Sequence, residues 1–350
     1  MSLTPEWRIR IDSWREELPR HIYRPLGAVA LSGFITHDQL TARDALQGPF
    51  QPMPPGTPWG PKWAYAWFKG RVLLPERAAG RRVVLKMDVG AESVVYVDGR
   101  AAGAVDDHHD AVTLAREARP GVAYDVLLEA YAGHGPRVVH AGPTPPGRQT
   151  VPEPPETQAL VGQSTFGIWE ESVYQLWIDV ETLYDLRESL DPDSLRVAQI
   201  DAGLRDFTLI VNLELPRQEM LATVRACREC LRPLLACVNG STAPTMVAFG
   251  HGHLDVAWLW PLAESERKAL RTLATQLALM SEYPEHRFLQ SQPALYRVLK
   301  DSYPAFYERV KTAVEAGQLT AEGATWVELD TNIPGGESVV RQFLHGQRFF

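Results

Sequence analysis

Hydrophobic and polar residues alternate with a period near two between Trp63 and Ala130, which is typical of half-buried β-strands. The alternation predicts strands over Trp67–Leu74, Arg82–Val89, Ser93–Val97 and Tyr124–Ala130. Asp98-Gly99, directly after the third of these, is a type I′ hairpin signal. With a last strand predicted over Val173–Val180, this region is expected to form an antiparallel β-sandwich.

After Val180 the hydrophobic period rises to about three and a half, which indicates helices. One helix, capped by Asp193 or Ser194, would bury Val197, Ile200, Leu204, Phe207 and Val211. A second helix opens at Pro216 and reaches towards Cys237. We therefore expect a helical connector after the sandwich.

From Thr245 onward strands and helices alternate. Strands are predicted over Met246–Phe249, Arg287–Ser291 and Gln318–Glu322, with helices over Glu264–Met280 and Tyr303–Ala316. Strands separated by helices pair in parallel through right-handed crossovers, so their carboxyl ends meet at one edge. Polar residues follow all three strands, and that edge is where barrels and open α/β sheets build their sites.

The chain has 350 residues, of which 45% are hydrophobic, and is expected to be multidomain. The predicted division is a β-sandwich over 1–180 with a Pro-rich loop at 142–155, a helical connector over 181–241, and the first βα units of a (β/α) barrel over 242–350.

The net charge of −8 and the lack of a dense basic run argue against nucleic-acid binding. The N-terminus does not resemble a signal peptide, and no apolar run is long enough to span a membrane. We therefore predict a cytoplasmic protein with no membrane partner, and a homo-oligomer is left open.

The chain has three cysteines, Cys227, Cys230 and Cys237, too few and too close together for a secreted disulfide framework. Cys227 and Cys230 match CxxC formally, but the segment has the pattern of an amphipathic helix in which Pro233 is expected to introduce a kink. We interpret these residues as buried thiols.

Candidate chemistry gathers after the strand at Met246–Phe249. In an extended segment alternate residues face the same way, so His251, His253 and Asp255 would converge while Leu254 and Val256 turn inward. Imidazole and carboxylate together suit zinc.

The residues that follow widen this motif into a resemblance. Residues 251–261 (HGHLDVAWLWP), with Glu264, Arg267, Lys268, Arg271 and Thr272, resemble the signature that opens the catalytic domain of family-38 α-mannosidases. Residues 288–292 (FLQSQ) and 326–338 (WVELDTNIPGGES) resemble the second strand and third loop of that domain. The similarity is closest to the cytosolic and vacuolar branch, in which a β-sandwich and a helical region precede the barrel.

The resemblance implies a retaining glycosidase that hydrolyses terminal α-mannosides of oligosaccharides and uses one zinc ion (Zn²⁺). Carried over by position, His253 and Asp255 are zinc ligands, and His251 hydrogen-bonds near the ion without binding it. Trp258 forms part of the wall against the mannose ring, and Asp330 and Glu328 lie near the pocket rim.

The resemblance also implies missing parts. Only two family ligands lie within the chain, and the family's nucleophilic aspartate is expected beyond residue 350. Residues 245–350 are fewer than half of the roughly 250 that a complete barrel needs. We expect a fragment or an interrupted reading frame, and no turnover by the 350-residue chain alone.

Two other functions remain possible from the sequence. His251 and His253 form an HxH pair, as in amidohydrolase-like metal hydrolases that use both imidazoles as ligands. The sandwich also resembles galactose-binding-like jelly rolls, so the chain could be a non-catalytic carbohydrate-binding module. Residues 106–110 (DDHHD) suggest a second metal cluster, but we interpret them as a solvated acidic turn.

Overall fold

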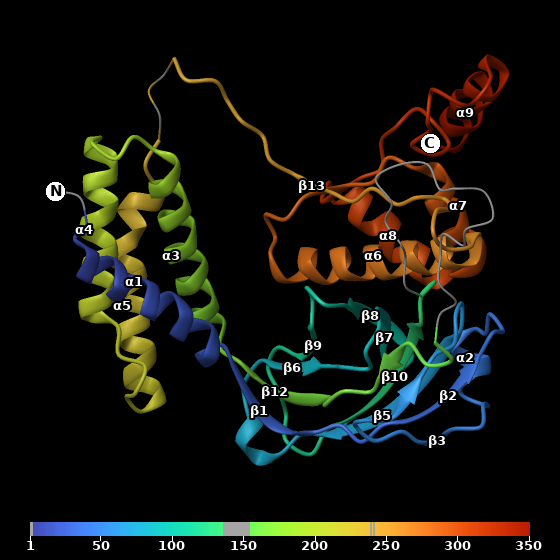
Figure 1. Cartoon of the computed structure of the whole chain (residues 1–350), viewed down its shortest axis with the longest axis horizontal. Coiled ribbons are helices and arrows are strands. Elements are labelled where there is room, and N and C mark those ends of the chain that lie inside the picture. The colour runs from blue at the N-terminus through green and yellow to red at the C-terminus, as the bar shows by residue number, and fades with distance from the viewer. Residues whose placement is uncertain (1–2, 136–154, 239, 241) are drawn as a thin grey trace.

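The structure is a computed structural model that describes residues 3–135, 155–238, 240 and 242–350. Figure 1 shows three groups of elements: a helical bundle, a β-sandwich, and an α/β unit that lies over the sandwich. Residues 142–154 of the predicted Pro-rich loop lie outside the described residues.

Two antiparallel sheets form the β-sandwich. The larger has the order β3 (Gln51–Pro52), β2 (Ser32–Thr36), β5 (Tyr65–Leu73), β10 (Ala123–Tyr131), β7 (Ser93–Val97) and β8 (Arg100–Val105). The smaller has the order β1 (Tyr23–Ala28), β12 (Thr165–Trp169), β6 (Val83–Lys86) and β9 (Ala111–Ala115). β4 (Pro58–Trp59) and β11 (Ala159–Leu160) form a small ladder, and α2 (Ala42–Ala45) is a single turn.

The four strands predicted between Trp67 and Ala130 are confirmed, with ends shifted by up to three residues. Asp98 and Gly99 have φ angles of 48° and 77° between β7 and β8, as a type I′ turn requires. The core between the sheets contains Trp59, Phe68 and Leu128.

The larger sheet is buried on both faces. Trp67, Tyr96 and Leu127 face away from the sandwich core and pack with Leu270 and Leu273 of the helix that covers them. This explains why β10 is buried without alternation from Val126 onward. Alternation with a period of two predicts that one face of the sheet is exposed to solvent, whereas here a helix packs on that face.

The predicted strand over Val173–Val180 is wrong, because α3 (Glu171–Ser189) covers it. Its buried residues are Val173, Leu176, Val180 and Leu183, at the three- and four-residue spacing of a helix face. Alternation in the first residues of this segment concealed the longer period.

The helical bundle consists of α1 (Pro5–Glu17), α3, α4 (Leu195–Ile210) and α5 (Arg217–Leu235). The cap at Ser194 is confirmed, since its side chain accepts from the Val197 N–H, and the predicted buried face of α4 is also confirmed. The α1 helix was not predicted. It packs against α3, α4 and α5, which come much later in the chain (Figure 1).

Cys227 is buried in α5, and burial raises the pKa of its thiol to about 12. The helical interpretation of CxxC is confirmed, but burial is not general, since Cys230 is partly exposed and Cys237 is exposed.

The α/β unit is built on three parallel strands, β13 (Gly250–His251), β14 (Phe288–Leu289) and β15 (Leu319–Thr320). The connections are α6 (Leu262–Glu282) and the pair α7 (Pro293–Ser302) and α8 (Pro304–Glu315), and α9 (Gly336–Phe349) follows β15. Leu270, Leu273, Leu277 and Met280 form the buried stripe of α6, as predicted.

The predicted strand over Met246–Phe249 is wrong, because pairing begins only at Gly250. Met246 and Val247 are 90% and 76% exposed. A buried apolar strand needs a cover on its faces, and the described residues provide none at this point.

Across the described ranges, each helix is too short or too polar to cross a lipid bilayer.

Candidate functional site

The loop after β13 brings two imidazoles and two carboxylates together. His253 Nε2 lies 3.1 Å from Asp255 Oδ1, and His253 Nδ1 hydrogen-bonds to Glu328 Oε2. His251 Nε2 lies 3.0 Å from Glu328 Oε1. The predicted convergence of His251, His253 and Asp255 is therefore present, with Glu328 joining the two rings.

Two buried glutamines at the end of β14 fix this loop. Gln290 donates to the Gly252 carbonyl at 3.0 Å, and Gln292 donates to the Leu254 carbonyl at 2.9 Å. Gln292 Oε1 also accepts from the Glu328 N–H at 3.2 Å. Both glutamines are 1% exposed, so their amides are committed to these backbone groups.

Glu328 lies between the two histidines and not at the pocket rim. It was expected near the pocket rim, but its carboxylate accepts from the Ser291 hydroxyl and contacts both His251 and His253. The available signal was its place after the third parallel strand, because the ends of neighbouring parallel strands meet at one edge.

The electrostatics of the cluster favour charged groups. The hydrogen bond to Glu328, and then the one to Asp255, raise the pKa of His253. Burial opposes ionisation of Glu328, but hydrogen bonds from Ser291 and His253 bring its pKa below the ordinary value. These side chains remain accessible, with exposed fractions of 51% for His253, 38% for Asp255 and 29% for Glu328.

The pair His253 and Asp255 suits a shared metal ion. Two ligands of a tetrahedral zinc ion, each about 2.1 Å from it, lie roughly 3.4 Å apart, close to the 3.1 Å between His253 Nε2 and Asp255 Oδ1. Over the described part of the chain, no set of three or more His, Cys, Asp or Glu residues is arranged to hold an ion. The pair therefore offers part of a coordination shell.

The two indoles that follow have different environments. Trp260 donates to Ser265 Oγ at 2.9 Å and is partly buried, whereas Trp258 is 58% exposed. Their rings meet edge to face at 5.6 Å. Trp260 is thus fixed to the start of α6, and Trp258 presents a ring to solvent.

Asp330 is not drawn into the cluster. Its Oδ1 accepts from the Asn332 N–H at 2.6 Å, and the described contacts do not join it to His253 or Asp255. The side chain is exposed on the loop before α9.

Several charged residues of α6 bind the sandwich. Arg267 Nε lies 2.5 Å from Glu129, and Lys268 Nζ lies 2.5 Å from Glu92. Arg271 pairs with Glu264 and lies 3.3 Å from Glu92. Arg267, Arg271 and Glu264 are buried, so this part of the motif joins two units.

The acidic turn at 106–110 does not form a metal site in the described structure. Asp106 Oδ1 accepts from the backbone N–H groups of His108 and His109, and Asp110 pairs with Lys86 at 2.7 Å. All five residues of the turn are exposed.

Two parts of the chain match known families. Residues 28–158 match the alpha-mannosidase jelly roll domain. Residues 243–350 match the glycosyl hydrolases family 38 N-terminal domain.

Curated relatives align along most of the chain. Alpha-mannosidase 2C1 of Mus musculus is 30% identical over 331 residues, covering 92% of this chain and 30% of that protein. Alpha-mannosidase 2C1 of Homo sapiens is 30% identical over 91% of this chain and 30% of that protein. Alpha-mannosidase of Saccharomyces cerevisiae is 29% identical over 84% of this chain and 27% of that protein. The chain thus spans about 30% of the length of the first two relatives.

Among solved structures, a β-glucuronidase of Ruminococcus gnavus aligns with 43% of this chain and 28% of its own length, at 12% identity and a TM-score of 0.30. A score this low does not establish a shared fold.

Proposed function

We propose that the chain is the N-terminal part of a retaining, zinc-dependent α-mannosidase, because residues 28–158 match the alpha-mannosidase jelly roll domain and residues 243–350 match the glycosyl hydrolases family 38 N-terminal domain. The proposed substrates are oligosaccharides with terminal α-mannosides. Turnover is proposed for the whole protein, because the chain spans about 30% of the mouse and human relatives.

The convergence of His253 and Asp255 carries this proposal. Their facing atoms are 3.1 Å apart and accessible to solvent, and imidazole and carboxylate are ordinary zinc ligands. When bound, zinc would coordinate two adjacent sugar hydroxyls and favour distortion towards an oxocarbenium-like transition state.

Glu328 and His251 would position the ligands without binding the ion. An acceptor at Nδ1 fixes the His253 tautomer and leaves Nε2 facing Asp255, which is the usual role of a carboxylate behind a metal-binding histidine. His251 and Ser291 hold the other oxygen of Glu328.

Trp258 and Asp330 are the proposed substrate contacts. The exposed indole of Trp258 can stack against the apolar face of a hexose, and Asp330 could accept from a hydroxyl at the edge of the site. The nucleophile is proposed to lie outside residues 1–350.

We also propose that further βα units complete a (β/α) barrel and that the helical connector ends at 241. The predicted boundary at 180 falls inside α3, which packs in the helical bundle. A cytoplasmic location, which the three free cysteines support, and a possible homo-oligomer also remain proposals.

A zinc titration by calorimetry tests the site. We expect His253→Ala and Asp255→Asn each to abolish saturable zinc binding, and His251→Ala to weaken it by roughly 10- to 100-fold. Asp330→Asn is the matched control, because it removes an exposed carboxylate that does not contact His253 or Asp255.

The same titration separates the proposal from an amidohydrolase-like site. Complete loss of zinc in His251→Ala, with zinc retained in Asp255→Asn, would favour a pair of imidazole ligands and contradict the mannosidase assignment.

A further inference from the structure

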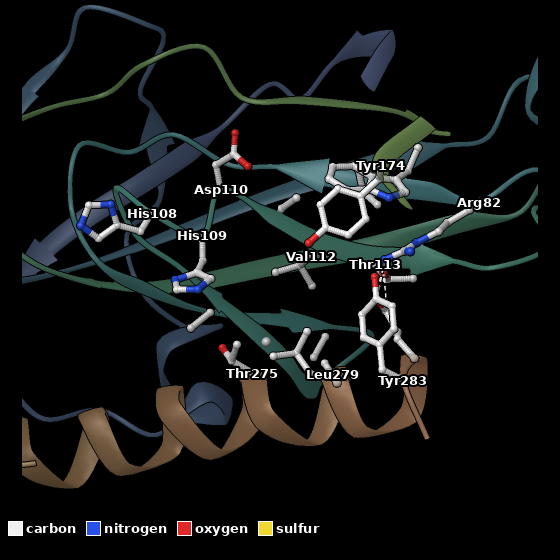
Figure 2. A pocket seen from close by; sticks show the side chains of 18 of the residues that line it. Arg82, His108, His109, Asp110, Val112, Thr113, Tyr174, Thr275, Leu279 and Tyr283 are labelled. Atoms are coloured by element: carbon white, nitrogen blue, oxygen red, sulfur yellow. Dashed lines mark hydrogen bonds and ion pairs between the residues drawn. The ribbon is translucent and has the colours of Figure 1, made fainter. Parts of the chain in front are cut away.

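A cavity that does not include the histidine cluster lies where the sandwich, the start of α3 and the second half of α6 meet. Its volume is about 390 Å³. Figure 2 shows His108, His109 and Asp110 on one side and Arg82, Tyr174 and Tyr283 on the other, with α6 beneath. We call this cavity the seam pocket.

One wall of the seam pocket is aromatic. The Trp169 and Tyr174 rings are 5.3 Å apart with planes inclined at 52°, and the Tyr174 and Trp177 rings are 6.0 Å apart at 48°. All three side chains are partly exposed and line the cavity. Rings inclined to one another in this way form a concave apolar surface.

The charges in the pocket are already neutralised. Arg82 lies 2.6 Å from Glu171, 2.5 Å from Glu282 and 2.9 Å from Thr113. Asp110, on the opposite side, pairs with Lys86 at 2.7 Å. An anionic ligand would meet two carboxylates around the one guanidinium, so the pocket does not favour anions.

Some polar groups in the pocket can nevertheless form further hydrogen bonds. Within the described residues, the Tyr174 hydroxyl and the Trp177 indole N–H have no hydrogen-bond partner, and Figure 2 shows the hydroxyl pointing into the cavity. Burial raises the pKa of Tyr174, so its hydroxyl stays protonated and can donate. On the other side the His108 ring is exposed and also available for hydrogen bonding.

We propose that the seam pocket is a second, metal-independent saccharide site that binds one neutral hexose unit. A sugar ring offers apolar C–H faces to the aromatic wall and hydroxyls to Tyr174, Trp177 and the histidine side. A purely apolar ligand would cover these polar groups without offering them hydrogen-bond partners. A volume of about 390 Å³ is within the ordinary range for small-ligand sites.

The choice of mannose as probe rests on the proposed function, but the pocket does not include the proposed zinc ligands. The test is titration of the whole chain with α-mannobiose in EDTA, followed by ligand-observed NMR and by the tryptophan indole N–H resonances. We expect saturable binding that shifts the Trp169 and Trp177 resonances and leaves the Trp63 resonance in place.

Variants locate the binding. Trp177→Ala should weaken α-mannobiose binding roughly tenfold, because it removes part of the aromatic wall. Tyr174→Phe keeps the ring and the fold but removes the free hydroxyl, and should weaken binding severalfold. Trp63→Ala is the matched control, since Trp63 is an exposed indole of the sandwich outside the pocket.

Each outcome bears on one proposal. Binding that disappears in EDTA and returns with zinc would overturn the seam pocket and leave the mannosidase site standing. Binding in EDTA that both Tyr174→Phe and Trp177→Ala leave unchanged would also overturn it. If binding survives EDTA and responds to these variants while His253→Ala has no effect on zinc affinity, the seam pocket stands and the zinc-site proposal fails.

Discussion

Two charged regions arise from one stretch of the chain, and they differ in burial. The seam between α6 and the sandwich pairs Arg267 with Glu129, and all but about one twentieth of each side chain is buried. The histidine cluster pairs His253 with Asp255, and both are more than one-third exposed. A motif of charged residues can therefore serve assembly at one end and ligand binding at the other.

The energetic consequence is that the two regions should respond oppositely to substitution. Removing one partner of a buried pair leaves an uncompensated charge away from water, which lowers the free energy of unfolding strongly. Removing an exposed group costs little stability, because water replaces the lost partner, so its effect should appear in ligand binding.

The largest expected effect on stability is at the Arg267–Glu129 pair between α6 and the sandwich. Arg267→Ala should lower the free energy of unfolding by about 3–5 kcal/mol, because the Glu129 carboxylate then stays buried without its cation. Urea unfolding measures this change. Its control is Arg267→Met combined with Glu129→Gln, which removes both charges and should recover most of the loss. A single-variant loss below about 1 kcal/mol would show that the pair is not buried in solution.

The second effect is at the cluster. Glu328→Gln should weaken zinc binding by roughly 10- to 100-fold, because the neutral amide orients His253 less well. Calorimetric titration with zinc measures it, and the melting temperature without zinc should stay near that of the parent. Unchanged zinc affinity alongside a lowered melting temperature would instead assign Glu328 a structural role.

A third substitution tests whether Trp258 contributes to ligand binding or to packing. Trp258→Ala should change the free energy of unfolding by no more than about 0.5 kcal/mol, since the side chain is 58% exposed. In the presence of zinc, α-mannobiose binding at the cluster should weaken. If stability falls by more than about 2 kcal/mol, the indole is a packing residue and not part of a sugar wall.

The smallest effect sets the baseline for an exposed pair. Arg341 and Glu337 form an ion pair on α9 with 64% and 74% of their side chains exposed. Arg341→Ala should cost about 0.3–0.5 kcal/mol in thermal unfolding. A loss comparable to that of Arg267→Ala would remove the contrast between buried and exposed pairs.

The sequence predicted local features better than it predicted which elements pack against one another. The turn at Asp98-Gly99 and the cap at Ser194 depend on a few neighbouring residues, and both were found. The strand predicted at Met246–Phe249 was wrong because apolar composition does not reveal whether a partner covers it. The burial of the second face of β10 was not predicted for the same reason, since the element that packs on it is α6, more than a hundred residues later in the chain.

The candidate site shows the same division. His251, His253 and Asp255 converge as predicted, because their spacing within one extended loop sets their directions. The central place of Glu328 depends on the pairing of three strands and on Gln292, and periodicity along the chain does not contain that information.

The most direct test is diffraction from crystals of the chain grown with zinc, with anomalous data collected at the zinc edge. The account predicts a peak about 2.0–2.2 Å from His253 Nε2 and from an oxygen of Asp255, with His251 outside bonding distance. A peak bound by His251 and His253 but not by Asp255, or zinc only at other surface groups, would contradict it.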